Sequence, residues 1–360
     1  MSEHASQGDL KAGSTRRRFL KQLGQTAVAG SVAASLAGPG GSSAEAAAPE
    51  RRVGYRTLGK TGLRVSEVGF GGHSWSYARA PDGRGGLRKV TLDEAVEMIR
   101  IGMDLGVNFL DSCTPMDESS IPGEALRRLG ARDKVIVSIR VSHKMKGNAN
   151  DRNEIYDWTE ARLRAWQTDC VDLCLLCNTE RDTPQSGYWD MSYSMDALDK
   201  LKAQGKIRFT GFGCHFTPEL FLEAFDKFGD YFDVVSLPYN VRHRAAETIL
   251  PAAKQKNLGV ITIKPFARGE LLTSFGETLR KQGDAVADGD LARDMMAFVL
   301  EHELVDVCTC GFHTAAQVRE NFSACWTKLT PAARERLEVA ALTPCPEPSH
   351  AWLEEGWRYA

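Results

Sequence analysis

The chain has 360 residues, with 45 lysine and arginine residues against 47 aspartate and glutamate residues, which gives a formal net charge of −2. This balance excludes a general electrostatic attraction for nucleic acid, so we expect no nucleic-acid partner. Removal of the N-terminal signal described next leaves roughly 310 residues, enough for one large α/β domain or two small ones with a buried core.

The first 48 residues are typical of a twin-arginine export signal. Residues 15–21 read Thr-Arg-Arg-Arg-Phe-Leu-Lys, residues 23–36 are apolar but rich in Gly, Ala and Ser, and residues 42–48 offer small-residue cleavage sites before Pro49. The apolar stretch falls well below the ~18 to 20 strongly apolar residues of a membrane span, and the cleavage tract argues against a basic nucleic-acid-binding tail. We therefore expect residues 1–48 to be removed and the protein to be exported already folded.

Export of a folded chain has consequences for location and for the cysteines. We expect the Tat export machinery as a partner, a periplasmic or otherwise exported location, and no integral membrane segment. Nine cysteines would suggest a disulfide framework in a short secreted protein. A large domain that folds in the reducing cytoplasm keeps its thiols reduced, so we expect mostly buried free thiols.

Behind the signal, short apolar runs alternate with longer amphipathic ones, as in repeated βα units around a parallel sheet. The expected strands are residues 65–71, 107–110, 135–139, 171–176, 209–212, 234–237, 260–263 and 305–310. The expected helices include residues 91–105, 218–228, 246–256 and 291–301. Eight such units predict a (β/α)8 TIM barrel, whereas a doubly wound sheet would want a Gly-x-Gly-x-x-Gly turn that residues 69–72 do not supply. We assign residues 49–330 to the barrel and residues 331–360 to a C-terminal tail packed on it.

One expected helix is well marked at both ends. Thr91 and Glu94 have the spacing of a capping box before residues 91–105, and Gly106 stands where a C-terminal glycine belongs. Leu92, Val96, Ile99 and Met103 recur at helical spacing and predict one apolar face.

The residues at the ends of the expected strands predict a functional site. In a TIM barrel the site lies where strands end and helices begin. The strand-end residues are His73, Trp75, Asp111, Arg140, His143, Cys177, Cys214, His215, Tyr239, Asn240, Lys264, Gly311, Phe312 and His313. Polar and soft side chains converging on one mouth indicate an active or binding site, and ordinary polar loop residues are the alternative.

The chain resembles the aldo/keto reductases over nearly all of residues 53–324. The resemblance rests on an ordered set of segments: residues 55–66 (YRTLGKTGLRVS), 107–111 (VNFLD), 171–176 (VDLCLL), 205–212 (GKIRFTGF), 238–240 (PYN), 263–266 (IKPF) and 317–321 (QVREN). It implies a TIM barrel and hydride transfer between a nicotinamide cofactor, NAD(P), and the carbonyl or alcohol group of a small-molecule substrate.

The resemblance also implies a catalytic Asp, Tyr, Lys and His, of which only the first is present, as Asp111. Met116 replaces the proton-donating Tyr, Arg140 replaces the Lys and Cys177 replaces the His. A thioether donates no proton and an arginine stays charged at neutral pH, whereas a nearby cation favours the thiolate form of a cysteine. The catalytic candidates are Asp111, Arg140, Cys177 and His215. We expect Asp111 and Arg140 to pair in the barrel mouth, in a catalytic or a structural role.

The cofactor-binding positions are mixed. The candidates are Tyr239, Lys264, Gly311, His313, Gln317 and Asn321. Gly311, Gln317 and Asn321 keep the spacing of the family's adenine-binding segment, and His313 stands where an Arg or Lys often binds the 2′-phosphate. Gly213-Cys214 replaces the Ser-Asn pair that usually binds the nicotinamide carboxamide in the family, and Ser236 replaces a Gln. The resemblance is therefore kept best for the adenosine half of the cofactor.

Two metal sites are weaker alternatives. Cys170, Cys174 and Cys177 have the Cys-x3-Cys-x2-Cys spacing of an iron–sulfur motif. Strand alternation opposes a cluster, because it puts Cys177 on the face opposite to the other two. The second candidate set, suited to zinc or copper, consists of strand-end residues that form no short motif, namely His73, Asp111, Cys177 and His215.

Three functions stay open at this point. The first is an exported aldo/keto reductase-like oxidoreductase with a rearranged active site, which would carry NAD(P) loaded before export and held tightly. The second is a non-catalytic barrel that binds a nucleotide, sugar or protein partner. The third is a metal-dependent enzyme that uses the barrel mouth. We take the first as the prediction.

Overall fold

The computed structural model describes residues 52–76, 79–81, 86–111, 120–142, 149–177, 191–213, 217–284 and 286–342. The predicted signal peptide, Met116, His143, Cys214, His215 and the tail beyond residue 342 lie outside the described residues. The structural statements that follow refer to the described residues alone.

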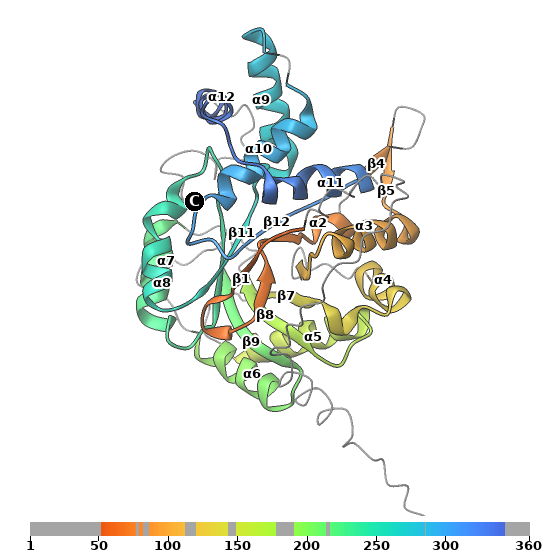
Figure 1. The fold of residues 1–360 in the computed structure, drawn as a ribbon. Helices are drawn as coiled ribbons and strands as arrows, with labels where there is room; N and C mark the ends of the chain where they lie inside the picture. Colours follow the sequence, from red (N-terminus) through yellow and green to blue (C-terminus); the bar gives the residue numbers. More distant parts are fainter. Residues whose placement is uncertain are drawn as a thin grey trace, which may run out of the picture. The chain divides into compact units, whose positions relative to one another are not determined.

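Eight parallel strands close into a barrel in the order β10-β11-β12-β3-β6-β7-β8-β9 (Figure 1). The strands are β3 (Val68–Phe70), β6 (Phe109–Asp111), β7 (Ile136–Ser142), β8 (Val171–Cys177), β9 (Ile207–Gly213), β10 (Val234–Pro238), β11 (Gly259–Ile263) and β12 (Val307–Cys310). Each one overlaps a strand expected from the sequence, so the predicted (β/α)8 barrel is confirmed.

Helices surround the barrel, and α9, α10 and α12 gather at the upper end of the view (Figure 1). The helices are α2 (His73–Ser76), α3 (Leu92–Asp104), α4 (Ile121–Leu129), α5 (Ala149–Ala165), α6 (Ser192–Ala203), α7 (Pro218–Phe228), α8 (Leu250–Gln255), α9 (Glu270–Lys281), α10 (Asp288–Leu300), α11 (Ala315–Phe322) and α12 (Pro331–Ala341). The Thr91–Glu94 capping box is present at the start of α3, and Gly106 follows its end at φ +96°. The guanidinium of Arg88, which binds Glu94, is the main reason that the pKa of this carboxyl falls to about 2.

Three details differ from the sequence-based expectation. Residues 246–256 begin as a short 3-10 helix, Ala245–Thr248, before α8 starts, because Pro251 has no backbone N–H to continue an upstream helix. Part of the predicted tail is α12, which Thr330 caps and Pro331 starts. The expected strand 65–71 is divided at Glu67, whose carboxylate accepts a hydrogen bond from the backbone N–H of Gly54.

A hairpin missed in the sequence closes the N-terminal end of the barrel. Its strands are β1 (Tyr55–Thr57) and β2 (Arg64–Ser66), paired antiparallel. Leu58 and Val65 of the hairpin join the apolar cluster that fills the barrel interior, together with residues such as Phe109. Arg56 donates to the carbonyl of Leu300 at the end of α10, and Lys60 donates to that of Gly229 after α7. Basic side chains at helix C-termini satisfy carbonyls that lack helical partners.

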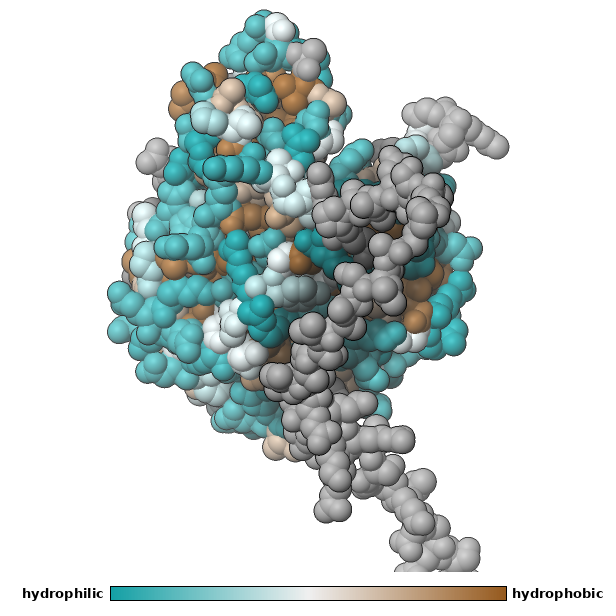
Figure 2. Space-filling view, viewed as in Figure 1, coloured by the Kyte–Doolittle hydropathy of each residue, from teal (hydrophilic) through white to brown (hydrophobic). Residues whose placement is uncertain are grey.

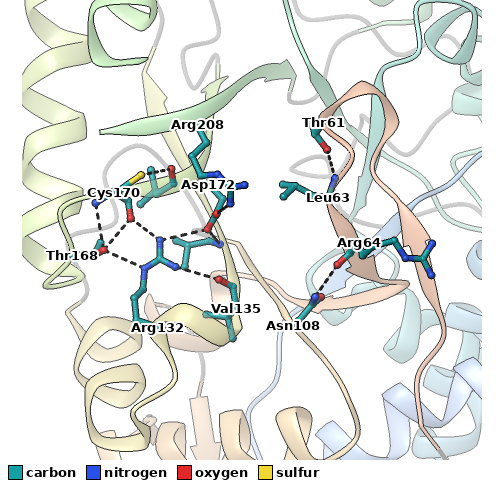
Figure 3. Close-up of polar contacts among 12 residues, drawn as sticks. Thr61, Leu63, Arg64, Asn108, Arg132, Val135, Thr168, Cys170, Asp172 and Arg208 are labelled. Atoms are coloured by element: carbon teal, nitrogen blue, oxygen red, sulfur yellow. Dashed lines mark hydrogen bonds and ion pairs between the residues drawn. The ribbon is translucent and has the colours of Figure 1, made fainter. Parts of the chain in front are cut away.

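Carboxylates also close the N-terminal end of the barrel wall. Asp172 in β8 accepts a hydrogen bond from the backbone N–H of Val137 in β7 at 2.9 Å and forms ion pairs with Arg132 and Arg208 (Figure 3). Asp233 and Asp306 repeat this arrangement before β10 and β12, where they accept from N–H groups of β9 and β11. A barrel floor built in this way serves stability, since TIM-barrel chemistry occurs at the opposite end.

The described surface gives no indication of a membrane span. The viewed face carries mostly hydrophilic residues where grey atoms do not cover it, and its hydrophobic residues lie in small groups (Figure 2). Within the described ranges, the helices are too short or too polar to cross a bilayer.

Candidate active site

The predicted pair of Asp111 and Arg140 lies inside the barrel. Asp111 ends β6, Arg140 lies in the adjacent strand β7, and the register sets Asp111 beside Ser138. Because side chains alternate along a strand, Ser138 and Arg140 point the same way, toward the interior. Asp111 and Arg140 are each 2% exposed, so two opposite charges share a buried site.

The pair has a defined geometry. The Nη2 and Nε atoms of Arg140 both donate to Oδ2 of Asp111, at 2.6 and 3.1 Å. The other carboxylate oxygen, Oδ1, accepts a hydrogen bond from the Ser138 hydroxyl at 2.7 Å. Arg140 Nη2 also donates to Oγ of Ser236 at 3.0 Å. A buried ion pair keeps its charges only where further hydrogen bonds satisfy them, and the two serines provide such bonds.

Ser138 and Ser236 were not among the sequence-based candidates. Ser236 was interpreted as the loss of a cofactor-binding Gln, and its contact with Arg140 crosses from β10 to a strand that is not its neighbour. Ser138 stands two residues before Arg140, so strand alternation could have placed it beside the arginine. The contact of Ser236 has no signal in the sequence.

The cysteines of the iron–sulfur alternative lie in different environments. Cys170 lies before β8 at the barrel floor, where its carbonyl accepts from Arg132 (Figure 3). Cys174 faces the outer core beside Thr159, and burial raises the pKa of its thiol to about 12. Cys177 ends β8 and is 3% exposed. The six described cysteines, which form no disulfide with one another, are Cys170, Cys174, Cys177, Cys308, Cys310 and Cys325.

The zinc or copper alternative depends on residues that the structure does not fully describe. His215 lies outside the described residues, and only the backbone of His73 is described. Among the side chains that are described, no three His, Cys, Asp or Glu residues gather closely enough to hold a metal ion.

The adenine-binding candidates lie around the start of α11. Thr314 caps this helix, and the side-chain oxygen of Gln317 accepts a hydrogen bond from the backbone N–H of His313 at 2.8 Å. Asn321 is buried and His313 is exposed. The structure therefore brings Gly311, His313, Gln317 and Asn321 into one segment after β12.

A cleft of about 400 Å³ opens beside this segment. Its lining residues are Ala80, Pro81, Asp93, Glu94, Glu97, His313, Thr314 and Ala315. The three acidic residues are each paired with an arginine, as Asp93–Arg128, Glu94–Arg88 and Glu97–Arg100. These ion pairs partly neutralise the carboxylates at its rim.

Lys264 begins an unusual backbone segment after β11. Its φ is +64°, and Ala267, Arg268 and Gly269 follow with φ values of +46°, +63° and +96°. Positive φ is rare outside glycine, and such strain concentrates at functional sites. Asn240 Nδ2 donates to the Lys264 carbonyl at 3.0 Å and ties this segment to the loop after β10. The segment leads into the N-terminus of α9, and its own N–H groups close the turn, as in the bond from Gly269 to the Phe266 carbonyl at 2.8 Å.

Tyr239 is not brought into the barrel interior. Alternation along β10 directs Ser236 inward, whereas Tyr239 belongs to the outer core. Its hydroxyl donates to Glu247 at 2.8 Å, and its ring packs against Phe298 and His302. Burial raises the pKa of Tyr239 above its usual range. This placement gives no support to the expected cofactor contact at Tyr239, and it leaves the phenol apart from the buried pair.

The comparisons with known proteins identify the family. The aldo/keto reductase family model matches residues 67–341, so the chain belongs to the aldo/keto reductase family. L-galactose dehydrogenase of Arabidopsis thaliana is 30% identical over 297 residues, which cover 76% of this chain and 88% of the relative. The aldo-keto reductase YhdN of Bacillus subtilis is 25% identical over 248 residues, which cover 66% of this chain and 69% of the relative.

Solved structures agree on the fold. The apo form of the aldo-keto reductase AKR11C1 from Bacillus halodurans superposes with a TM-score of 0.59 at 22% identity, over 82% of this chain and 99% of that chain. At this identity the likeness concerns the barrel alone. Family membership makes the protein an aldo/keto reductase-like oxidoreductase by class, in a family that generally uses NAD(P).

Proposed function

We propose that this protein is an exported oxidoreductase that moves a hydride between a tightly held NAD(P) and a carbonyl or alcohol substrate at a rearranged active site. The observation that carries the proposal is the buried Asp111–Arg140 pair inside an aldo/keto reductase barrel. It keeps a fixed positive charge in the position where the family resemblance calls for a lysine.

Arg140 suits the stabilisation of negative charge on a carbonyl oxygen. A preorganised cation in a buried site stabilises charge that develops in the transition state without reorganising first. An arginine stays protonated at neutral pH, so Arg140 holds its charge but does not give up a proton. During reduction the carbon accepts the hydride, and the proton for the oxygen comes from water. Asp111 holds the guanidinium and balances its charge in the interior.

The described residues fit the adenosine and diphosphate parts of a dinucleotide. The N-terminus of α11, where the helix dipole favours anions, is suited to a diphosphate. Gln317 and Asn321 would hold the adenosine, with His313 beside them. When bound, the cofactor supplies or accepts the hydride. Gly213 and Ser236 offer fewer amide-binding groups for the nicotinamide than the family resemblance implies.

The first substrates to test are sugars and simple aldehydes. The relative at 30% identity is an L-galactose dehydrogenase, which supports an aldose as one candidate class. We propose L-galactose with NAD⁺ or NADP⁺ in the oxidising direction and 4-nitrobenzaldehyde with NADH or NADPH in the reducing direction. The absorbance and mass spectrum of protein purified from the exported fraction would reveal a retained dinucleotide or a metal.

Turnover is expected to be slow, because Met116 replaces the proton donor. General acid catalysis commonly supplies ~100- to 10,000-fold, and typical enzymes turn over about 10 times per second. We therefore expect 4-nitrobenzaldehyde to be reduced at about 0.1 per second or less, measured as NADPH oxidation at 340 nm. Arg140→Met should abolish this residual rate. Turnover at the typical rate would mean that another acid has taken over, and Cys177 and His215 would be mutated first. Binding of a dinucleotide without any turnover would favour the non-catalytic alternative.

Export is proposed from the twin arginines and is tested separately. The Val53 side chain is buried and its backbone N–H bonds to Leu105, so cleavage must precede this residue to leave the fold whole. We expect the mature chain to begin between Ala47 and Arg51, as read by N-terminal sequencing. Replacing Arg16 and Arg17 with lysine should retain the protein inside the cell, as judged by fractionation and immunoblotting. Normal export of this double variant would contradict the proposal.

A further inference from the structure

The contact between Asp111 and Arg140 does not by itself fix the guanidinium. Two parallel bonds to both oxygens of a carboxylate would lock the plane of an arginine. Here both Nε and Nη2 donate to Oδ2, while Oδ1 accepts the Ser138 hydroxyl. The two bonds to Asp111 therefore meet at one carboxylate oxygen. A second point of contact, away from Asp111, helps to define where the charge of Arg140 points.

Ser236 supplies that second point from another part of the barrel. Its Oγ accepts from Nη2 of Arg140 at 3.0 Å, and the serine is fully buried. Strand β10 is separated from β7 by β8 and β9, so the contact spans the interior. The backbone of Ser236 is held on both sides, by Gly213 in β9 and by Ile261 in β11. The acceptor therefore has a position set by the barrel wall.

We propose that Ser236 is a positioning residue for Arg140, which holds the guanidinium in the orientation that binds the substrate oxygen. This inference rests on the proposed hydride-transfer function. A serine hydroxyl adds no net charge, so its effect is on geometry and not on the charge of the site. Small misplacements of a group at the reacting centre cost up to about 100-fold in rate. Ser138 has the corresponding role for the carboxylate of Asp111.

The kinetic test compares Ser236→Ala with Ser236→Thr, which keeps an oxygen at the same position. We expect Ser236→Ala to lower kcat for 4-nitrobenzaldehyde and NADPH by about 10- to 100-fold, with KM within about twofold of wild type, and Ser236→Thr to restore most of kcat. Thr309→Val is the matched control. It removes a buried barrel hydroxyl that bonds to the Thr262 carbonyl and does not contact Arg140. An unchanged kcat in Ser236→Ala, with an active wild type, would overturn the proposal.

A second readout is independent of activity. Proton–nitrogen NMR of the arginine side chains should show a sharp, exchange-protected Nε–H signal for Arg140, assigned by its loss in Arg140→Met. This signal should broaden in Ser236→Ala and return in Ser236→Thr, while Thr309→Val leaves it unchanged. A sharp Arg140 signal in Ser236→Ala would reject the positioning role whatever the activity. An inactive wild type whose signal still depends on Ser236 would reject the proposed function and keep the positioning role.

Discussion

Arg140→Met will lower the free energy of unfolding by about 3 to 5 kcal/mol, because it leaves the Asp111 carboxylate buried without its partner. Asp111→Leu should cost a similar amount for the converse reason. Urea unfolding of the mature protein, followed by tryptophan fluorescence, measures both values. The large effect follows from burial, since the same pair on the surface would contribute about 1 kcal/mol or less.

The double variant Asp111→Leu/Arg140→Met tests whether the loss of stability comes from a buried charge without its partner. Removing both charges should restore much of the loss, because neither charge is then buried without the other. The recovery will be incomplete, since Ser138 and Ser236 each lose a partner, and an unsatisfied buried hydroxyl costs about 1 to 3 kcal/mol. Equal melting temperatures near that of the wild type in all three variants would contradict a structural contribution and leave the pair a purely functional role.

The strands were predictable because each one is a short apolar run bounded by helix signals. The Thr91–Glu94 capping box placed the start of α3, and it recurs in the structure with both of its hydrogen bonds. The hairpin at the floor was harder to see. Its strands β1 and β2 have three residues each, too few to show an alternating pattern, and the buried Leu58 lies just after β1. The burial of Leu58 depends on a barrel end that exists only after closure.

Strand ends and strand alternation predict only part of the candidate site. Asp111 ends β6, and Arg140 lies past the middle of the adjacent strand β7. Their pairing therefore follows from the barrel topology. Tyr239 was expected near the cofactor on family resemblance, but its position one residue beyond β10 turns it to the outer core. Ser236 reaches Arg140 across the interior, a contact between strands that are far apart in the sheet order.

The floor carboxylates were also not foreseen. Asp172, Asp233 and Asp306 each stand among apolar residues at the start of a strand, where an acidic residue suggests an ordinary loop boundary. The structure explains all three in the same way, because each carboxylate accepts a hydrogen bond from a backbone N–H of the preceding strand in the barrel order. Burial raises the pKa of Asp306 above its usual range, and Lys254 opposes this shift.

Gly213 links the stability of the wall to the geometry of the site. In the sequence it appeared as the loss of a cofactor-gripping serine. The structure gives a positive reason for glycine, since φ is +138° and a Cβ there would overlap the carbonyl oxygen of Ser236. The same strand pair, β9 and β10, holds the backbone of Ser236 in register with Gly213. A side chain at position 213 would therefore displace the residue that contacts Arg140.

Gly213→Ala should lower the free energy of unfolding by about 2 to 6 kcal/mol, because backbone strain costs about 1 to 3 kcal/mol and overpacking adds a similar amount. Gly62→Ala is the matched control. Gly62 also has a positive φ, +68°, but its Cβ would meet open space, so only about 1 to 2 kcal/mol of conformational cost applies. Urea unfolding of both variants under one condition makes the comparison. The folded fraction of the Gly213→Ala variant should also have a lower kcat, since a displaced Ser236 no longer positions Arg140. Equal stabilities in the two alanine variants would mean that the contact between β9 and β10 is looser than the structure places it, and the positioning of Arg140 through Ser236 would lose its support.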